Sequence, residues 1–256
     1  MTKRNRKNLN RKLAATAVAA CFAAGRVAYA NPTGPVVVKG SASFATSGNT
    51  LSVINTPNAI INWQQFSIGS SEVTRFIQQS AASAVLNRVV GADPSVILGT
   101  LQSNGRVFVI NPNGLLVGAG ARIDVAGLVA STLNISNEDF LAGRLRFAAD
   151  PSAPAAAIVN KGSITAGTGG SIYLIGSAVD NHGVITAPSG DIVLAAGKSV
   201  RVAEGGAPRL QVEITAPEDR TLNLSEVTYG NRGIYSGLVR NSGTITANSV
   251  VHTADG

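Results

Sequence analysis

Short runs in which apolar and polar residues alternate follow one another along most of this chain, with glycine and asparagine between them. SITA at 163–166 and VITA at 184–187 are two such runs. Alternation with a period of two predicts half-buried β-strands, and glycine or asparagine between the runs marks turns. The pattern therefore indicates an all-β protein.

The heptapeptide pattern N-x-G-x-I-T-A occurs three times. Its first two copies begin 21 residues apart, and the third begins 60 residues after the second. A companion pattern, G-x-I-x-L, begins at Gly170 and again at Gly190. Each period of about 20 residues thus holds two short strands. The repeat turns are expected at Asn160, Gly162, Asn181, Gly183, Asn241 and Gly243.

Such a short period, with strands too short to be stable alone, predicts a solenoid whose coils stack and share one core. We expect a parallel β-helix with about 20 residues per coil and ladders of isoleucine inside it. A leucine-rich repeat is disfavoured because the chain has neither an L-x-x-L-x-L pattern nor a repeated helix. A β-sandwich with accidental internal similarity is the alternative fold.

The first part of the mature chain, 31–110, is less periodic than the repeat coils expected over 111–256. It contains the single tryptophan, Trp63, together with Phe66 and Phe76. A solenoid needs a cap at its open end, and we expect these aromatic side chains to form the core of that cap. A platform for a ligand is the competing interpretation.

Two segments interrupt the repeat. SNEDFLAG at 136–143 begins with the S-x-x-D capping pattern and ends at glycine, which predicts a helix of one or two turns. Residues 203–237 lack the repeat and are expected to leave the coils as an extruded hairpin or loop with a polar tip at 217–220.

Residues 1–30 have the features of a secretory signal peptide. Six basic residues precede a short apolar run, and an A-x-A cleavage site closes the segment at Ala28 and Ala30. Seven of the 21 basic residues lie in this leader, so the mature chain has 14 basic and 14 acidic residues. This balance argues against nucleic acid as a partner. A lipoprotein box ending at Cys21, the single cysteine, is a minor alternative for anchoring.

Candidate catalytic residues are few. His182 and His252 are the only histidines, and no metal-ligand, nucleophile or phosphate-binding motif is present. Asp180 and Asp191 fall in neighbouring coils at different positions of the period, so we expect no catalytic carboxylate pair, no metal and no cofactor. A carbohydrate-active β-helix enzyme and a self-contained surface adhesin are the alternative functions.

The tetrapeptide NPNG at 111–114 separates two apolar runs within 107–123. Asn111, Pro112, Asn113 and Gly114 match the preferences of a type I turn. The turn either sets the register of the first coils or contacts a partner, and the sequence does not separate these two roles.

Several segments around this turn resemble the N-terminal secretion domain of filamentous haemagglutinin-type exoproteins. They are VLNRV at 85–89, LGTLQSNGRVFVI at 98–110 followed by NPNG, and ASTLNISNEDF at 130–140. Such exoproteins are the passengers of two-partner secretion and include large adhesins and contact-dependent inhibition toxins. The similarity begins near residue 31 and covers nearly all of the mature chain.

The resemblance implies a right-handed parallel β-helix with N-terminal capping strands and hairpins outside the coils. It also implies Sec export, recognition in the periplasm by the POTRA domains of an Omp85-type outer-membrane barrel, and β-helix folding at the surface of a Gram-negative bacterium. Any host-cell or glycan ligand would bind to downstream regions. The long extended signal region of some members is missing, and no effector region follows residue 256, so we expect either a fragment or a very small effector.

Overall fold

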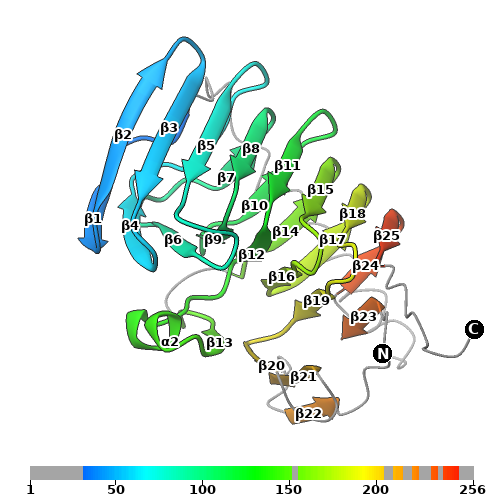
Figure 1. The fold of residues 1–256 in the computed structure, drawn as a ribbon. Coiled ribbons are helices and arrows are strands. Elements are labelled where there is room, and N and C mark those ends of the chain that lie inside the picture. The colour runs from blue at the N-terminus through cyan, green and yellow to red at the C-terminus, as the bar shows by residue number, and fades with distance from the viewer. Residues whose placement is uncertain are drawn as a thin grey trace, which may run out of the picture.

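The computed structural model of the chain is a β-helix whose strands form three long sheets (Figure 1). It describes residues 31–151, 155–204, 210–215, 221–224, 232–235 and 239–247. The predicted leader with Ala28, Ala30 and Cys21, the loop tip 217–220 and His252 lie outside the described residues. Within the described ranges, no helix has the length and apolar character needed to span a membrane.

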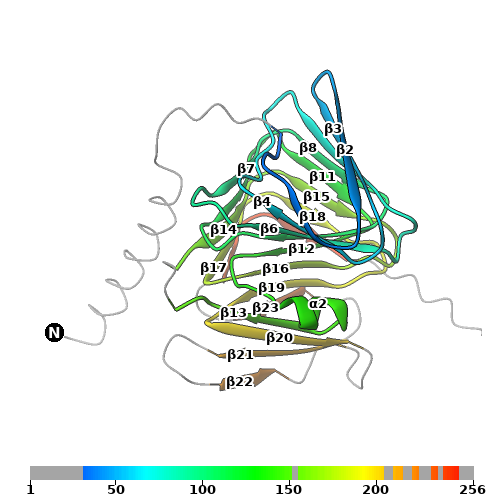
Figure 2. The ribbon, with the colours of Figure 1, turned by 90° about the vertical axis from the view of Figure 1, so that its left-hand side faces the viewer.

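Three sheets line the sides of the tube, and Figure 2 shows them enclosing a triangular cross-section. Sheet I contains β1 (Val36–Lys39), β4 (Ala59–Trp63), β6 (Ala84–Val89), β9 (Arg106–Ile110), β12 (Gly127–Ser131), β16 (Ile172–Gly176), β19 (Ile192–Ala196) and β23 (Arg232–Tyr235). Sheet II contains β7 (Ser95–Ile97), β10 (Leu115–Val117), β14 (Ala157–Asn160), β17 (Ala178–Asn181) and β24 (Val239–Asn241). Sheet III contains β2 (Ala42–Ser47), β3 (Thr50–Asn55), β5 (Val73–Ile77), β8 (Thr100–Ser103), β11 (Arg122–Val125), β15 (Ser163–Ala166), β18 (Val184–Thr186) and β25 (Thr244–Thr246).

Each regular coil has three strands, one in each sheet, and parallel pairing joins it to the coils on either side. The expectation of two strands per period was therefore wrong. The missed strand is the one in sheet II, which is only three or four residues long and ends at the asparagine that had been assigned to a turn. The predicted coil length is confirmed, since Ile172 pairs with Ile192 and Ser163 with Val184.

An aliphatic ladder runs through the tube along sheet III. Leu101, Ile123, Ile164, Ile185 and Ile245 occupy one register position in five successive coils. None of these side chains is more than 3% exposed. The ladder of isoleucines predicted from the I-T-A repeats is thus confirmed. Burying each such side chain contributes about 1.5–3 kcal/mol, and stacking makes that burial available to strands too short to be stable alone.

The third repeat copy stacks directly on the second, although 60 residues separate them in the chain. Val184 pairs with Thr244, and Ile185 with Ile245. Between these copies the chain leaves the coils and forms β20 (Ser199–Glu204), β21 (Leu210–Thr215) and β22 (Thr221–Leu224). The departure predicted over 203–237 is therefore only partly correct: it begins a few residues earlier, at β20, and it ends before β23, which pairs with β19 in sheet I.

The departing strands form an antiparallel sheet IV with β13 (Leu145–Ala148), which follows the first interruption of the coils. The short predicted helix is present as α2 (Asn137–Leu141), whose N-cap Ser136 accepts a hydrogen bond from the N–H of Asp139. Sheet IV and α2 cover the outer face of sheet I (Figure 2). A second apolar core fills the space between them, with Phe108, Tyr173 and Val193 on sheet I facing Phe140 and Phe147.

Arg88 attaches this outer layer to sheet I. Its guanidinium donates hydrogen bonds to Asn134 Oδ1 at 3.2 Å, to the carbonyl of Ile135 at 2.7 Å and to Asn137 Oδ1 at 2.9 Å. Burial lowers the pKa of this guanidinium, which nevertheless stays charged at neutral pH. The segment that leads into α2 is therefore held by one side chain from the sheet below it.

The N-terminal end of the tube is closed by β1 and β2, which pair antiparallel with β4 and β3. All other pairings within sheets I to III are parallel among the described strands. An antiparallel strand at the end of a parallel stack interrupts the template that another coil would use. The N-terminal capping strands implied by the family resemblance are therefore present.

Candidate functional site

The NPNG tetrapeptide forms the corner between β9 in sheet I and β10 in sheet II. The N–H of Gly114 donates to the carbonyl of Asn111 at 3.2 Å, which closes a four-residue turn. Gly114 has a φ of 119°, in the region that favours glycine because it has no Cβ. The backbone geometry at the end of this turn therefore favours glycine at position 114.

Both asparagine side chains of the turn bind the corner of the preceding coil. Asn111 is fully buried, and its Nδ2 donates to Ser95 Oγ at 2.9 Å and to the carbonyl of Asp93 at 3.0 Å. Its Oδ1 accepts a hydrogen bond from the N–H of Asn113 at 2.9 Å. The Nδ2 of Asn113 in turn donates to the carbonyl of Gly91 at 2.9 Å. Two side chains thus join two consecutive corners.

This arrangement specifies register as well as stability. A net hydrogen bond contributes about 0.5–1.5 kcal/mol, and leaving a buried amide or hydroxyl without a partner costs about 1–3 kcal/mol. A slip of the coil by one residue would separate Asn111 from Ser95 and leave both groups unpaired. The corner therefore disfavours misaligned pairing of β10 with β7, its neighbour in the preceding coil.

The three predicted cap aromatics lie inside the first coils. The exposed fractions of Trp63, Phe66 and Phe76 are 0%, 1% and 1%. The rings of Trp63 and Phe66 meet edge to face at 5.7 Å, and those of Phe66 and Phe76 stack at 6.4 Å. The indole N–H of Trp63 donates to Asn87 Oδ1 at 2.9 Å. Because the rings are buried, none offers a face to a ligand.

The repeat asparagines form an amide ladder at the corner between sheets II and III. Asn160 Nδ2 donates to Asn181 Oδ1 at 2.7 Å, and Asn181 Nδ2 donates to Asn241 Oδ1 at 2.7 Å. Gly162, Gly183 and Gly243 stack beside this ladder, and a Cβ on Gly183 would lie 2.1 Å from the carbonyl oxygen of Gly162. The repeat N-x-G therefore places an interior amide and a close backbone contact in each coil.

The structure also brings together a histidine, an aspartate and a serine that the sequence did not connect. His182 Nε2 lies 3.0 Å from Asp180 Oδ1, and His182 Nδ1 lies 2.6 Å from Ser242 Oγ. His182 and Ser242 occupy the same x position in the second and third N-x-G copies. Alignment of the copies on adjacent coils, rather than three periods apart, would have predicted this contact.

Among the described residues of this corner, the backbone N–H groups beside Ser242 already have acceptors. Acyl transfer needs N–H groups directed at the developing oxyanion. The N–H groups of Ser242 and Gly243 both donate to the carbonyl of Asn181, at 2.8 and 3.0 Å. The contact of His182 with Ser242 therefore joins neighbouring coils without the donors of an oxyanion hole.

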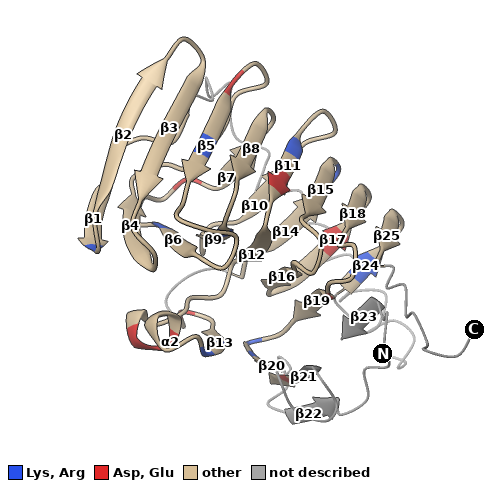
Figure 3. Ribbon diagram, in the orientation of Figure 1, with Lys and Arg blue, Asp and Glu red and all other residues tan. Residues whose placement is uncertain are grey.

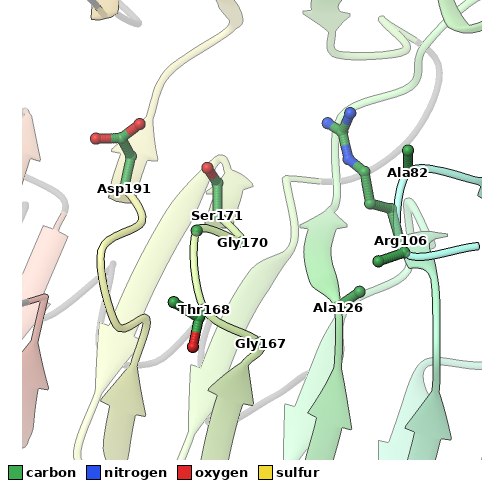
Figure 4. A pocket seen from close by; sticks show the side chains of 10 residues that line it. Ala82, Arg106, Ala126, Gly167, Thr168, Gly170, Ser171 and Asp191 are labelled. Carbon is green, nitrogen blue, oxygen red and sulfur yellow. The ribbon is translucent and has the colours of Figure 1, made fainter.

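A groove of about 530 Å³ runs along the corner between sheets III and I (Figure 4). Arg106 and Asp191 project from separate coils, with Ser171 between them. The strand registers put Arg106 and Asp191 three coils apart, or about 14 Å at the usual strand spacing. One carboxylate so far from the cation does not make the paired carboxyl groups of a glycosidase. Asp180 lies at another corner, in β17, and the described residues hold no group of three potential metal ligands.

Known proteins match most of this chain. Residues 28–255 match the TPS secretion domain family. A heme/hemopexin-binding protein of Haemophilus influenzae is 42% identical over 105 residues, which are 41% of this chain and 12% of that protein. The chain thus matches only a small part of this relative's length.

Two solved structures have the same fold. The HMW1 secretion domain from Haemophilus influenzae superposes with a TM-score of 0.70 and 41% identity, covering 74% of this chain and 51% of that one. The filamentous hemagglutinin secretion domain superposes with a TM-score of 0.51 and 19% identity, covering 85% and 80% of the two chains. The second likeness concerns the fold alone. The family match, the β-helix and the HMW1 likeness agree, and this chain belongs to the TPS secretion domain family of exoproteins that Gram-negative bacteria secrete to the cell surface.

Proposed function

We propose that this domain is bound in the periplasm by the POTRA domains of an Omp85-type outer-membrane transporter, which then secretes the exoprotein. In this scheme Sec export precedes recognition, and cleavage after Ala30 makes Asn31 the new N-terminus. The domain acts as a signal and a folding template and performs no catalysis. An adhesin or toxin region follows it.

The coupling of Asn111 and Asn113 to the preceding corner is the observation that carries the template role. Three hydrogen bonds, donated by the side-chain amides of Asn111 and Asn113 to the preceding corner, favour one register of an early coil. Later coils stack on earlier ones in that register, with their backbone groups paired and their apolar side chains buried. Folding outside the cell can therefore draw the rest of the chain outward without ATP.

Strand chemistry supports recognition of the unfolded domain. Its short alternating segments are suited to β-augmentation, in which an extended peptide adds to the edge of a partner's sheet. In the folded domain most of these segments already have neighbours on both sides, and β1 and β2 are end strands with one neighbour each. We therefore expect the transporter to bind the unfolded chain more tightly than the folded one.

Purified POTRA domains of a transporter encoded beside this exoprotein would test the proposal. They should retain the mature domain diluted from urea and release it as it folds. A mature domain destabilised by Gly183→Ala should be retained longer. Equal capture of an unrelated unfolded β-protein, or no capture of the unfolded domain, would contradict the proposal.

The leader is tested separately. Secreted protein should begin at Asn31, and Cys21→Ala should leave both cleavage and release unchanged. Incorporation of labelled fatty acid that depends on Cys21 would instead establish lipoprotein anchoring.

A further inference from the structure

A second depression lies on the outer face of sheet IV, beside the start of α2. It has a volume of about 430 Å³, and Asn134, Asp139, Arg146, Arg201 and Glu213 contribute to its lining. Figure 3 shows basic residues on β13 and β20 and acidic residues on α2 in this region. This face points away from the tube, since the opposite face of sheet IV packs on sheet I.

Two arginines face each other across this surface. Arg146 on β13 is the register partner of Arg201 on β20 in an antiparallel pair. Directly opposed residues of such a pair have Cβ atoms about 4.5–5.5 Å apart, and like charges there are destabilising. An unfavourable charge pair therefore forms part of the lining of the depression.

Nearby carboxylates do not neutralise the pair. Asp139 makes its close contact with Arg144, at 2.6 Å. Glu213 lies 3.9 Å from Arg201, at the limit of an ion pair, and both of these side chains are about half exposed. No carboxylate of the described residues lies within ion-pair distance of Arg146. Among the described residues, Arg144 thus has a close carboxylate, Arg201 has a more distant one, and Arg146 has none within ion-pair distance.

The positive field of this cluster acts on its own carboxylate. The pKa of Asp139 is lowered, first by the hydrogen bond from Arg144 and also by the charges of Arg144 and Arg146. The depression also holds an uncommitted neutral donor, because the amide Nδ2 of Asn134 has no hydrogen-bond partner among the described residues. Asn134 Oδ1 is occupied, since it accepts from Arg88 Nε and from the N–H of Ile135.

We propose that this depression binds an oxyanion group, a phosphate, sulfate or carboxylate, between Arg146 and Arg201. A planar guanidinium donates two parallel hydrogen bonds to such a group, and two guanidinium groups on adjacent strands can hold one oxyanion from both sides. The amide of Asn134 supplies a further donor at the edge. A volume of about 430 Å³ is within the range of small-ligand sites.

Removal of one arginine separates a binding role from a structural one. If the pair serves binding, Arg146→Gln relieves the repulsion and raises the stability of the ligand-free domain, while it removes the response to anions. If Arg146 instead stabilises the sheet, the same variant is less stable at every anion concentration. Ligand binding to the folded state alone raises the unfolding midpoint with concentration.

The experiment is a titration of the mature domain with inorganic phosphate, sulfate and citrate at constant ionic strength set by chloride. Unfolding midpoints and NMR signals of the arginine side chains are followed. The wild type should show saturable stabilisation and shifts confined to Arg146 and Arg201. Arg146→Gln and Arg201→Gln should each weaken binding by about tenfold or more, and Glu213→Gln should tighten it. The relative affinity for citrate and for the two inorganic anions identifies carboxylate or tetrahedral oxyanion as the preferred group.

Arg122 provides the matched control, since it is an exposed arginine on sheet III paired with Asp124 at 3.0 Å. Arg122→Gln should leave the titration unchanged. A wild type without saturable binding, equal losses in Arg122→Gln, or lower stability of Arg146→Gln in chloride alone would each overturn the proposal.

Discussion

The Nδ2 of Asn111 donates a hydrogen bond of 2.9 Å to Ser95 Oγ, and this bond links two successive coils within the core of the β-helix. Asn111 belongs to a turn that could be recognised in the sequence, whereas Ser95 begins a three-residue strand that could not. The NPNG turn therefore contributes to the fold through its hydrogen bonds with the coil before it.

Asn111→Ala should destabilise the mature domain by about 3 kcal/mol, because it leaves a buried hydroxyl and two backbone groups without their partner. Asn113→Ala should cost about 1 kcal/mol, since Asn113 is only half buried and loses fewer bonds. Urea unfolding followed by circular dichroism measures both values. Equal decreases in the free energy of unfolding of the two variants would show that burial of the asparagine does not determine its contribution to stability.

The glycine stack permits a paired test. In Gly183→Ala the new Cβ would lie 2.1 Å from a carbonyl oxygen of the coil below, whereas at Gly120 nothing lies within 4 Å. Gly183→Ala should therefore lower the free energy of unfolding by about 3 kcal/mol or more, and Gly120→Ala should change it by about 0.5 kcal/mol or less. Similar unfolding midpoints for the two variants would contradict the close approach of successive coils at the N-x-G corner.

Asn87 and Trp63 form a buried polar contact at the capped end of the tube. Asn87→Ala should cost about 2–3 kcal/mol, since the indole N–H and the carbonyl of Phe108 both lose a partner. Trp63 is the single tryptophan of the chain, so its fluorescence reports on this region directly. We expect a red-shifted emission in Asn87→Ala. An unchanged spectrum and midpoint would show that the hydrogen bond contributes nothing.

The ion pair between Asp139 and Arg144 predicts a pH dependence. The pKa of Asp139 is lowered in the folded state, so its contribution to stability is present above the ordinary carboxyl pKa of about 3.9 and is lost as the pH falls through the folded value. Wild type should be more stable than Asp139→Asn at pH 7, and the difference should disappear once the pH lies below the lowered pKa of Asp139 in the folded state. A difference that grows on acidification would have the wrong sign for this ion pair.

Much of the tube could be predicted from local sequence, because each repeat carries its own pattern. Ile164, Ile185 and Ile245 stack as the I-T-A copies indicate, and Ser136 begins the expected helix. The strands of sheet II were missed because they are very short and end in buried asparagines, whose amide ladder exists only between coils.

Sheet IV could not be predicted from local sequence. Leu145 pairs with Val202, and Phe147 with Val200, so this sheet joins two interruptions more than 50 residues apart. Neither interruption repeats a pattern found elsewhere, and nothing in the alternation of either segment specifies the other as its partner. The opposed pair Arg146 and Arg201 depends on this pairing of β13 with β20. In the same way, the contact of His182 with Ser242 depends on the stacking of two repeats that are distant in the chain.

The most direct test of the account is release of the exported domain from cells with and without the transporter, comparing wild type, Asn111→Ala and Asn181→Ala. Asn111 and Asn181 are both fully buried asparagines, one at an early corner and one in a later coil. The account predicts transporter-dependent release of the wild type, a large loss in Asn111→Ala and a smaller loss in Asn181→Ala at matched stability. Release of the wild type without the transporter, or no release with it, would contradict the assignment of this domain as the secretion signal.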